Sequence, residues 1–188
     1  MSASRDLDSF SLETPRLLLR PPHLDDLDAM AVVFADPEVV RFIGNGEPRP
    51  RERVEQSLTI GRSLWEQRGY GPFTVITKCD DAIIGDCILV PIARSGTDAI
   101  DYSTRGPEVE IGYRLSSASW GHGYATEAAR AVLEWARAPE PDGAGLNEII
   151  AVTYPENTAS QNVLHKIGMH CTGTTERYYD CTTVHFTT

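Results

Sequence analysis

The chain has 188 residues, a length typical of one domain that buries a substantial core. Its composition, 41% hydrophobic and 23% charged, is that of an ordinary soluble protein. The formal net charge of -10 argues against nucleic acid as the main partner, because phosphate binding requires a basic surface. The same charge either favours cationic substrates or only keeps the protein in solution, and the second interpretation is the better supported.

The distribution of apolar residues also argues against membrane insertion and secretion. No apolar run approaches the length that spans a bilayer, and residues 1–10 carry charges where a signal peptide has an apolar segment. The sequence predicts a cytoplasmic protein with a flexible terminus at residues 1–10 and a single domain at residues 11–188. The cysteines form no C-x-x-C pair, so we expect neither a metal site nor a redox dithiol. They are Cys79, Cys87, Cys171 and Cys181.

The first half of the chain alternates apolar segments with proline-containing connections. We expect a strand from Arg16 to Arg20 and a helix that begins at Asp25 or Asp26 and ends near Pro37. A second helix is expected over residues 51–68, because its apolar residues recur at helical spacing.

Four arginines flank the glycine- and proline-rich loop before the second helix: Arg41, Arg49, Arg51 and Arg53. They either contact substrate or form a solvated basic face, and the solvated face is the interpretation favoured for charge runs. Residues 73–78 and 82–92 are the next predicted strands, joined as a short hairpin. Residues 93–107 show no clear period and are expected to form a loop.

The second half of the chain has the clearest periodicity. Its predicted elements are strands at 108–115 and 148–154, helices at about 125–136 and 158–166, and a closing antiparallel pair at 173–179 and 182–187. Together with the first half, this order predicts a mixed α/β sheet with helices on both faces.

Six residues connect the strand at 108–115 to the following helix: Trp120, Gly121, His122, Gly123, Tyr124 and Ala125. The two glycines allow positive φ, and the first amides of a helix attract anions such as phosphate. Neither a Walker loop nor the dinucleotide fingerprint is present, because no Lys-Ser/Thr follows the glycines and Thr126 replaces the third glycine. On this turn alone, a phosphate site and an ordinary structural connection both remain open.

A second stretch, Asn157 to Met169 (NTASQNVLHKIGM), changes the interpretation of this turn. Together the two stretches resemble the GNAT superfamily of acyl-CoA-dependent N-acetyltransferases, and they are most similar to its Rim-type branch (RimJ/RimL-like). Matches at Leu12 to Arg20 and Asp36 to Val40 extend the resemblance over nearly the whole chain. The resemblance implies a mostly antiparallel sheet in which the strands at 108–115 and 148–154 run parallel and splay apart around acetyl-CoA.

Acyl transfer to an amine requires a base, because only the neutral amine attacks a thioester. Glu110 is the candidate, since it lies on the predicted central strand on the face opposite Ile111, where burial would raise its pKa. A structural role in a salt bridge is equally open. Glu108, two residues earlier on the same face, is the second choice.

The resemblance implies the other binding roles. A backbone amide near Leu115 would stabilise the oxyanion that develops on the thioester carbonyl. The turn amides would hold the pyrophosphate, and Tyr113 would lie beside the cofactor on the central strand. Asn157 would bond the pantetheine amides, cap the following helix, or do both.

The acid that protonates the leaving thiolate is assigned to Ser160, as in the Rim-type branch, although a serine in a first helical turn is often only a cap. Many GNAT enzymes have a tyrosine where this chain has Leu164, and Tyr178 and Tyr179 are the alternative acids. Three positions lack charged or polar groups common in the family, which predicts weaker CoA affinity: Ala118, His122 and Asn162.

The sequence therefore predicts an acetyl-CoA-dependent N-acetyltransferase that transfers directly to a protein N-terminal amine or a small amine. The alternative is a catalytically idle acyl-CoA-binding or interaction module on the same fold, and a nucleotide-binding domain is a more distant one. Dimers are common in the resembled branch, so a homodimer is also open.

Overall fold

The computed structural model describes residues 6–97, 101–102 and 105–188, whose strands form one eight-stranded sheet. The strands in chain order are β1 (Leu12–Glu13), β2 (Leu17–Arg20), β3 (Phe73–Thr77), β4 (Ile83–Pro91), β5 (Val109–Leu115), β6 (Ile149–Thr153), β7 (His170–Thr175) and β8 (Thr183–Thr187). Their order across the sheet is β1-β2-β3-β4-β5-β6-β8-β7, and every neighbouring pair is antiparallel except β5 and β6.

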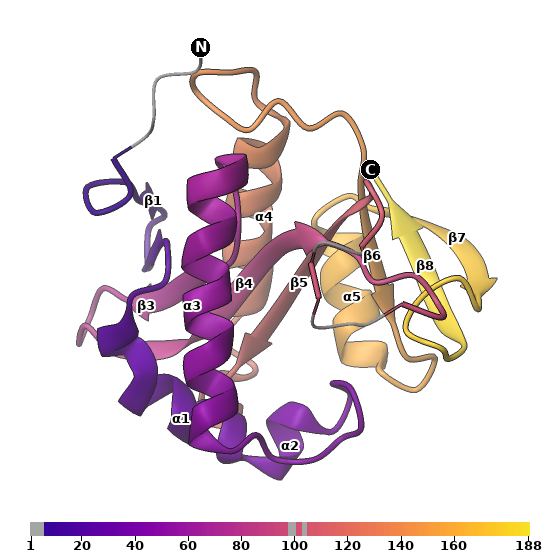
Figure 1. Cartoon of the computed structure of the whole chain (residues 1–188), viewed down its shortest axis with the longest axis horizontal. Helices are drawn as coiled ribbons and strands as arrows, with labels where there is room; N and C mark the ends of the chain where they lie inside the picture. Colours follow the sequence, from indigo (N-terminus) through magenta and orange to yellow (C-terminus); the bar gives the residue numbers. More distant parts are fainter. Residues whose placement is uncertain (1–5, 98–100, 103–104) are drawn as a thin grey trace.

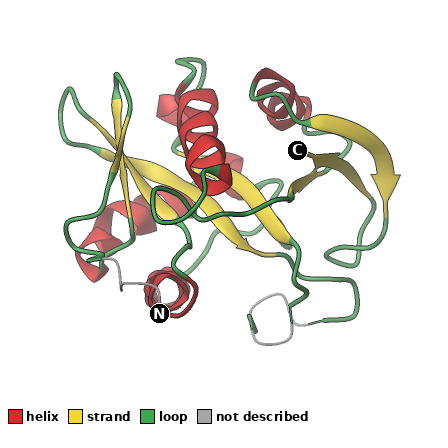
Figure 2. Cartoon of the chain, turned by 90° about the horizontal axis from the view of Figure 1, so that it is seen from above, coloured by secondary structure: helices red, strands yellow, loops and turns green. Residues whose placement is uncertain are grey.

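Helices cover both faces of this sheet (Figure 1). They are α1 (Leu27–Ala35), α2 (Pro37–Val40), α3 (Arg51–Arg68), α4 (Tyr124–Arg137) and α5 (Thr158–Lys166), with short 3-10 turns at Leu24–Asp26 and Ser117–Ser119. Seen from above, α4 and α5 lie on one side of the sheet while α1 and α3 lie on the other (Figure 2). The predicted fold class is confirmed, including the helices on both faces and the parallel strand pair.

The helices are held by the apolar stripes that the sequence predicts. On α4, Ala128, Ala129, Val132 and Ala136 are completely buried against the sheet. On the opposite face, Met30 and Phe34 of α1 pack with Val54 and Leu58 of α3 in a second apolar cluster. Small residues on α4 bring its backbone close to β4 and β5, which sets the position of the helix that follows the glycine turn.

The two parallel strands pair only at their start. Val109 lies opposite Ile149 and Glu110 opposite Ile150, and the pairing of β5 with β6 ends there. β5 continues to Leu115 along β4, whereas β6 continues to Thr153 along β8. A gap therefore opens between the two strands beyond Glu110, as expected from the family resemblance.

The helix predicted to end near Pro37 is confirmed as α1, which ends at Ala35, and Pro37 then begins α2 after the Asp36 cap. Two other local predictions are wrong. The first tail strand spans His170–Thr175 and not 173–179, so Tyr178 and Tyr179 lie in the following turn. The strand predicted at 16–20 is present as β2, but it is not the first strand, because residues 12–13 pair with it as β1.

Residues 1–5, half of the terminus predicted to be flexible, lie outside the described residues, as does part of the loop predicted at 93–107. Phe10, in contrast, packs against the rings of Trp65 and Trp135 at centroid distances of 5.4 and 5.5 Å. Across the described ranges, the helices are too short or too polar to cross a bilayer.

Candidate active site

A groove of about 1280 Å³ lies at the gap between β5 and β6 and is lined by residues from both faces of the sheet. Most of the predicted site residues line it: Glu110, Tyr113, Leu115, Trp120, Gly121, Gly123, Tyr124, Ala125, Asn157 and Ser160. Residues from α1, the loop before α3, and the turn after β7 line its other end. The tertiary structure thus brings together the two motifs that are separate in the sequence.

The glycine turn has the conformation expected of an anion site. Gly121 has φ 78° and Gly123 has φ 80°, values that an L-residue rarely adopts. Gly123 is the N-cap of α4 and makes no side-chain cap, and the first intrahelical bond runs from Glu127 N to Gly123 O at 3.0 Å. The amides of Tyr124, Ala125 and Thr126 precede that bond, so they and the helix dipole suit the pyrophosphate of CoA.

His122 is the member of the turn that does not line the groove. Its carbonyl oxygen instead accepts a hydrogen bond from Arg16 Nη1 at 2.8 Å. Arg16 also donates through Nε to Glu127 Oε2 at 2.7 Å, and its guanidinium lies 4.7 Å from the centre of the Tyr124 ring. The guanidinium of the residue that precedes β2 therefore fixes the turn, but its charge is paired with Glu127 and does not replace the positive charge that the sequence lacks at Ala118 and His122.

The ladder between β4 and β5 determines where the backbone of β5 points. Ile92 N donates to Glu108 O at 2.9 Å and Ser116 N donates to Ile84 O at 2.7 Å. Since bonding alternates along an antiparallel pair, the amides of Tyr113 and Leu115 point away from β4 and into the gap. Trp120 Nε1 donates to Leu115 O at 2.8 Å, which secures this end of the strand. The geometry fits a pantetheine chain that pairs with β5.

Asn157 and Ser160 lie at the start of α5, across the gap from Tyr113. Asn157 Oδ1 accepts from Ser160 N at 3.1 Å, which is the predicted cap, and Asn157 also lines the groove. Tyr113 donates to Ser160 O at 2.7 Å, and its hydroxyl lies 3.1 Å from Ser160 Oγ. Two hydroxyls therefore meet where the family resemblance places the leaving sulfur. Burial raises the pKa of Tyr113 well above its ordinary value.

Glu110 is buried at the point where β5 and β6 part, with 6% of its surface exposed. Burial raises the pKa of Glu110 to about 7, while a hydrogen bond from Tyr179 and the charges of Arg105 and Arg114 oppose this rise. A carboxyl group with this pKa accepts a proton effectively near neutral pH.

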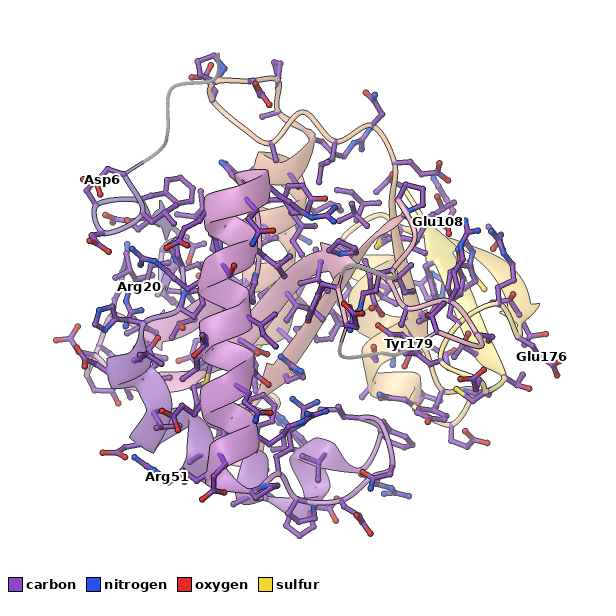
Figure 3. The ribbon with its side chains drawn as sticks, in the orientation of Figure 1. Asp6, Arg20, Arg51, Glu108, Glu176 and Tyr179 are labelled. Carbon is purple, nitrogen blue, oxygen red and sulfur yellow. The ribbon has the colours of Figure 1, made fainter. Side chains whose placement is uncertain are left out.

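Glu108, the second choice, has a structural environment. It accepts from Arg94 Nη2 at 2.7 Å, Arg177 Nη2 at 3.1 Å and Tyr178 Oη at 2.9 Å. Burial alone would raise its pKa, but these partners hold the pKa of Glu108 below its ordinary value. Neither Glu108 nor Tyr178 lines the groove. Figure 3 labels Glu108 and Tyr179 on the same side of the molecule, next to the yellow ribbon of β7 and β8.

Two contributions were missed in the sequence: Arg16 beside the turn, and Tyr179 as a partner of Glu110. The sequence indicates Tyr179 only as an alternative acid, yet its hydroxyl donates to the candidate base. Arg16 lies within the family match at Leu12 to Arg20, which is the one indication in the sequence that this arginine has a role at the site. No local pattern indicates that it contacts His122, which is 106 residues away.

Within the described residues, no cluster of three or more metal-ligating side chains is found. A glycine turn at the start of a helix that opens onto a gap between two parallel strands, with a buried carboxyl group where those strands part, is the arrangement expected of an acyl-CoA-dependent acetyltransferase.

Residues 16–170 match the family model of the acetyltransferase (GNAT) domain, so the chain belongs to this family and is an acetyl-CoA-dependent N-acetyltransferase. Among curated proteins it is similar to the uncharacterized N-acetyltransferase p20 of Bacillus licheniformis, with 28% identity over 89% of this chain and 86% of p20.

Two solved structures illustrate the fold. A GNAT-family acetyltransferase from Bacillus anthracis has a TM-score of 0.74 and 22% identity, covering 95% of this chain and 98% of its own. RimL, a ribosomal L7/L12 acetyltransferase in complex with coenzyme A, has a TM-score of 0.72 and 15% identity, covering 95% and 97%. At this identity RimL shows a common fold alone, so membership of the Rim-type branch stays a prediction.

Proposed function

We propose that this acetyltransferase moves the acetyl group directly to a primary amine within a ternary complex, without a covalent enzyme intermediate. The observation that carries this proposal is the position of Glu110. Its carboxyl group is buried beside the gap, lines the groove and has a pKa of about 7. A group with these properties is suited to accept a proton from an attacking amine.

The residues of the chain take separate roles. Acetyl-CoA supplies a thioester whose carbonyl carbon bonds to the amine nitrogen while its C–S bond breaks. Glu110 accepts the proton of the amine, and the Leu115 amide donates to the oxygen on which negative charge develops, an interaction of the order of 3 kcal/mol. Ser160 donates toward the departing sulfur, and the Tyr113 hydroxyl, 3.1 Å away, supports Ser160.

Cysteine chemistry does not fit this geometry. Cys87 is completely buried in the core, and burial raises the pKa of its thiol far above the ordinary value. Cys181 lines the groove, but it follows the turn after β7 and belongs to neither motif. Direct transfer therefore accounts for the site with the fewest assumptions.

The alternative function is an acyl-CoA-binding module without turnover, because a leucine stands at position 164 where many family members have a tyrosine. Leu164 is buried in the core with 1% of its surface exposed, so it offers the groove nothing. The position of Ser160 favours the enzyme, since its hydroxyl lies beside the gap next to Tyr113, whose own O–H donates to Ser160 O.

Calorimetric titration with acetyl-CoA and then with ATP, followed by thiol release in the presence of amines, tests the proposal. Saturable binding of acetyl-CoA alone, with release of CoA that depends on an amine, is expected. If acetyl-CoA binds but no peptide N-terminus or small amine causes release of CoA, the idle module is favoured. Equal binding of ATP would indicate a nucleotide site.

A further inference from the structure

The part of the groove on the α1 and α3 side, where an acceptor would enter, contains a guanidinium group that lacks a counter-ion. Arg49 lines this region, and across the described ranges its side chain has no hydrogen bond or ion pair. The sequence favoured a solvated basic face for Arg49, which is wrong for this residue. Burial, followed by repulsion from Arg114, lowers the pKa of Arg49 to about 10.

Backbone and ring contacts hold Arg49 in place. Its amide donates to Phe34 O at 2.9 Å, which ties the loop before α3 to the end of α1. Its guanidinium lies 4.9 Å from the centre of the Phe34 ring, and that of Arg114 lies 4.8 Å from the same centre. A guanidinium that is ordered before binding loses little conformational entropy when a ligand arrives.

The charges around Arg49 sum to an excess of positive charge. The carboxylate of Asp86 attracts Arg49 without forming an ion pair with it, and instead binds Arg114, its cross-strand neighbour, accepting from Arg114 Nε at 2.8 Å and from its Nη2. Arg53 also acts on Arg49, and in the described part of the chain Arg53 has no carboxylate partner. The local excess is notable in a chain whose net charge is -10.

The first turn of α3 adds to this potential. The N-cap of this 18-residue helix is Pro50, which makes no side-chain cap, and Pro50, Arg53 and Val54 line the groove. The positive end of the helix dipole therefore lies beside Arg49.

The positive region formed by Arg49, Arg53 and the first turn of α3 lines the same groove as the candidate base. Glu110, Gly112 and Arg114 alternate onto one face of β5, and all three line the groove. From Glu110 to Arg114 the strand extends by four residues, or roughly 13 Å. Gly112 has no side chain, so the space between these two residues is open. A bound molecule can therefore have its amine near Glu110 and another group near Arg49.

We propose that the acceptor carries an anionic group, a carboxylate or a phosphate, which Arg49 binds while the amine lies beside Glu110. This inference rests on the proposed transfer to a primary amine and specifies its substrate class. A mostly buried guanidinium without a counter-ion is costly in the free protein, and an anionic ligand removes that cost.

The test uses pairs of amines that differ only in the anionic group and are long enough to reach from Glu110 toward Arg49: triglycine and triglycine amide, 8-aminooctanoate and octylamine, and 6-aminohexyl phosphate and 6-aminohexanol. Thiol release from acetyl-CoA gives kcat/KM, and calorimetric titration of the CoA-saturated protein measures amine binding independently of turnover. At least one anionic member should exceed its neutral partner by roughly tenfold or more, and the pair involved distinguishes carboxylate from phosphate.

Arg49→Gln should lower kcat/KM and binding for the anionic member roughly 10- to 100-fold, mainly through KM, and leave the neutral partner unchanged. Arg49→Lys should restore part of the loss. Arg51→Gln is the matched control, because Arg51 pairs with Asp28, does not line the groove and lies at the periphery of the molecule (Figure 3).

The two proposals can fail separately. Equal turnover of anionic and neutral amines, unaffected by Arg49→Gln, would overturn the anion site and leave the transferase intact. Binding of an anionic amine that depends on Arg49, without turnover of any amine, would support the anion site and overturn the transfer. If no anionic amine binds the CoA-saturated wild-type protein, the anion site is overturned.

Discussion

Tyr179 donates its hydroxyl to the carboxylate of Glu110, although the two residues are 69 positions apart in the sequence. Tyr179 has φ 59° and the next residue, Asp180, has φ 54°, so two consecutive residues hold a left-handed conformation without glycine. Contacts on both sides maintain it, from Tyr179 N to Ala93 O at 3.3 Å and from Gly96 N to Asp180 Oδ1 at 2.7 Å. Strained backbone of this kind often occurs at functional sites.

Replacing the candidate base should abolish most of the activity. Glu110→Gln should lower kcat roughly 100-fold or more, because general-base catalysis typically contributes that much, while the Kd for acetyl-CoA stays within about twofold. Glu108→Gln is the control, since Glu108 is held by Arg94 and Arg177 outside the groove. Equal loss in both variants, or none in Glu110→Gln, would contradict the assignment. Stopped-flow thiol release and calorimetry supply the two readouts.

The Tyr179 hydrogen bond should tune the pH dependence. It favours the ionised form of Glu110, so Tyr179→Phe removes a stabilising partner of the carboxylate and should raise its pKa further above 7. We expect kcat/KM of the wild-type protein to rise with pH through about 7, and the midpoint to move upward in the variant. An unchanged midpoint would mean that Glu110 does not control this limb of the profile. Tyr178→Phe, which loses a bond to Glu108 alone, is the control.

The same pKa shift predicts a pH-dependent difference in stability. The pKa of Glu110 rises from 4.5 to about 7 on folding, so the folded protein holds a proton that the unfolded chain releases. That stabilisation is complete below about pH 4.5 and is lost as pH rises through about 7. The glutamine of Glu110→Gln resembles the protonated glutamate and does not ionise. The free energy of unfolding of this variant should therefore increase relative to that of the wild-type protein between pH 5 and pH 8, by up to roughly 3 kcal/mol.

Urea unfolding at intervals between pH 5 and pH 8 measures this difference. The control, Glu108→Gln, should show no growing advantage over this range, because the pKa of Glu108 lies below its ordinary value and the group stays ionised throughout. A constant difference between Glu110→Gln and the wild-type protein would mean that Glu110 is ionised at every pH tested.

The pair of hydroxyls across the gap should act on the chemical step. Ser160→Ala removes the Oγ that lies 3.1 Å from Tyr113 Oη, yet it keeps the backbone amide bonded to Asn157. We expect a loss of roughly tenfold to 100-fold in kcat with little change in the Kd for acetyl-CoA. Tyr113→Phe should cost less, and the double variant should lose less than the two single effects combined. Full activity in Ser160→Ala would leave Ser160 as a helix residue only.

The glycine turn should control cofactor binding. Gly123→Val forces a β-branched residue to φ 80°, which should displace the first amides of α4 and raise the Kd for acetyl-CoA roughly tenfold or more. Gly69→Val is a matched control, because Gly69 has φ 72° at the end of α3 and does not line the groove. It should lose stability without losing affinity. Undiminished affinity in folded Gly123→Val would contradict the assignment of the turn.

Local sequence determined the elements of this protein and its family. The alternation of Val109, Ile111, Tyr113 and Leu115 predicts β5, the helical spacing after Ala125 predicts α4, and the glycines between them predict the turn. These signals are short-range, because a strand, a helix or a positive φ depends on residues only a few positions apart. Ordered over the chain, they suffice to place it in the acetyltransferase family.

Only the tertiary structure decided which charged and polar groups neutralise one another. Asp86 meets Arg114 across 28 positions, Tyr179 meets Glu110 across 69, and Arg16 meets Glu127 across 111. Arg49 lies in the same arginine-rich stretch as Arg51 and Arg53, and among the described residues it forms no ion pair with a carboxylate. A pKa depends on burial and on neighbours brought together by folding, and no local pattern of residues encodes either of them.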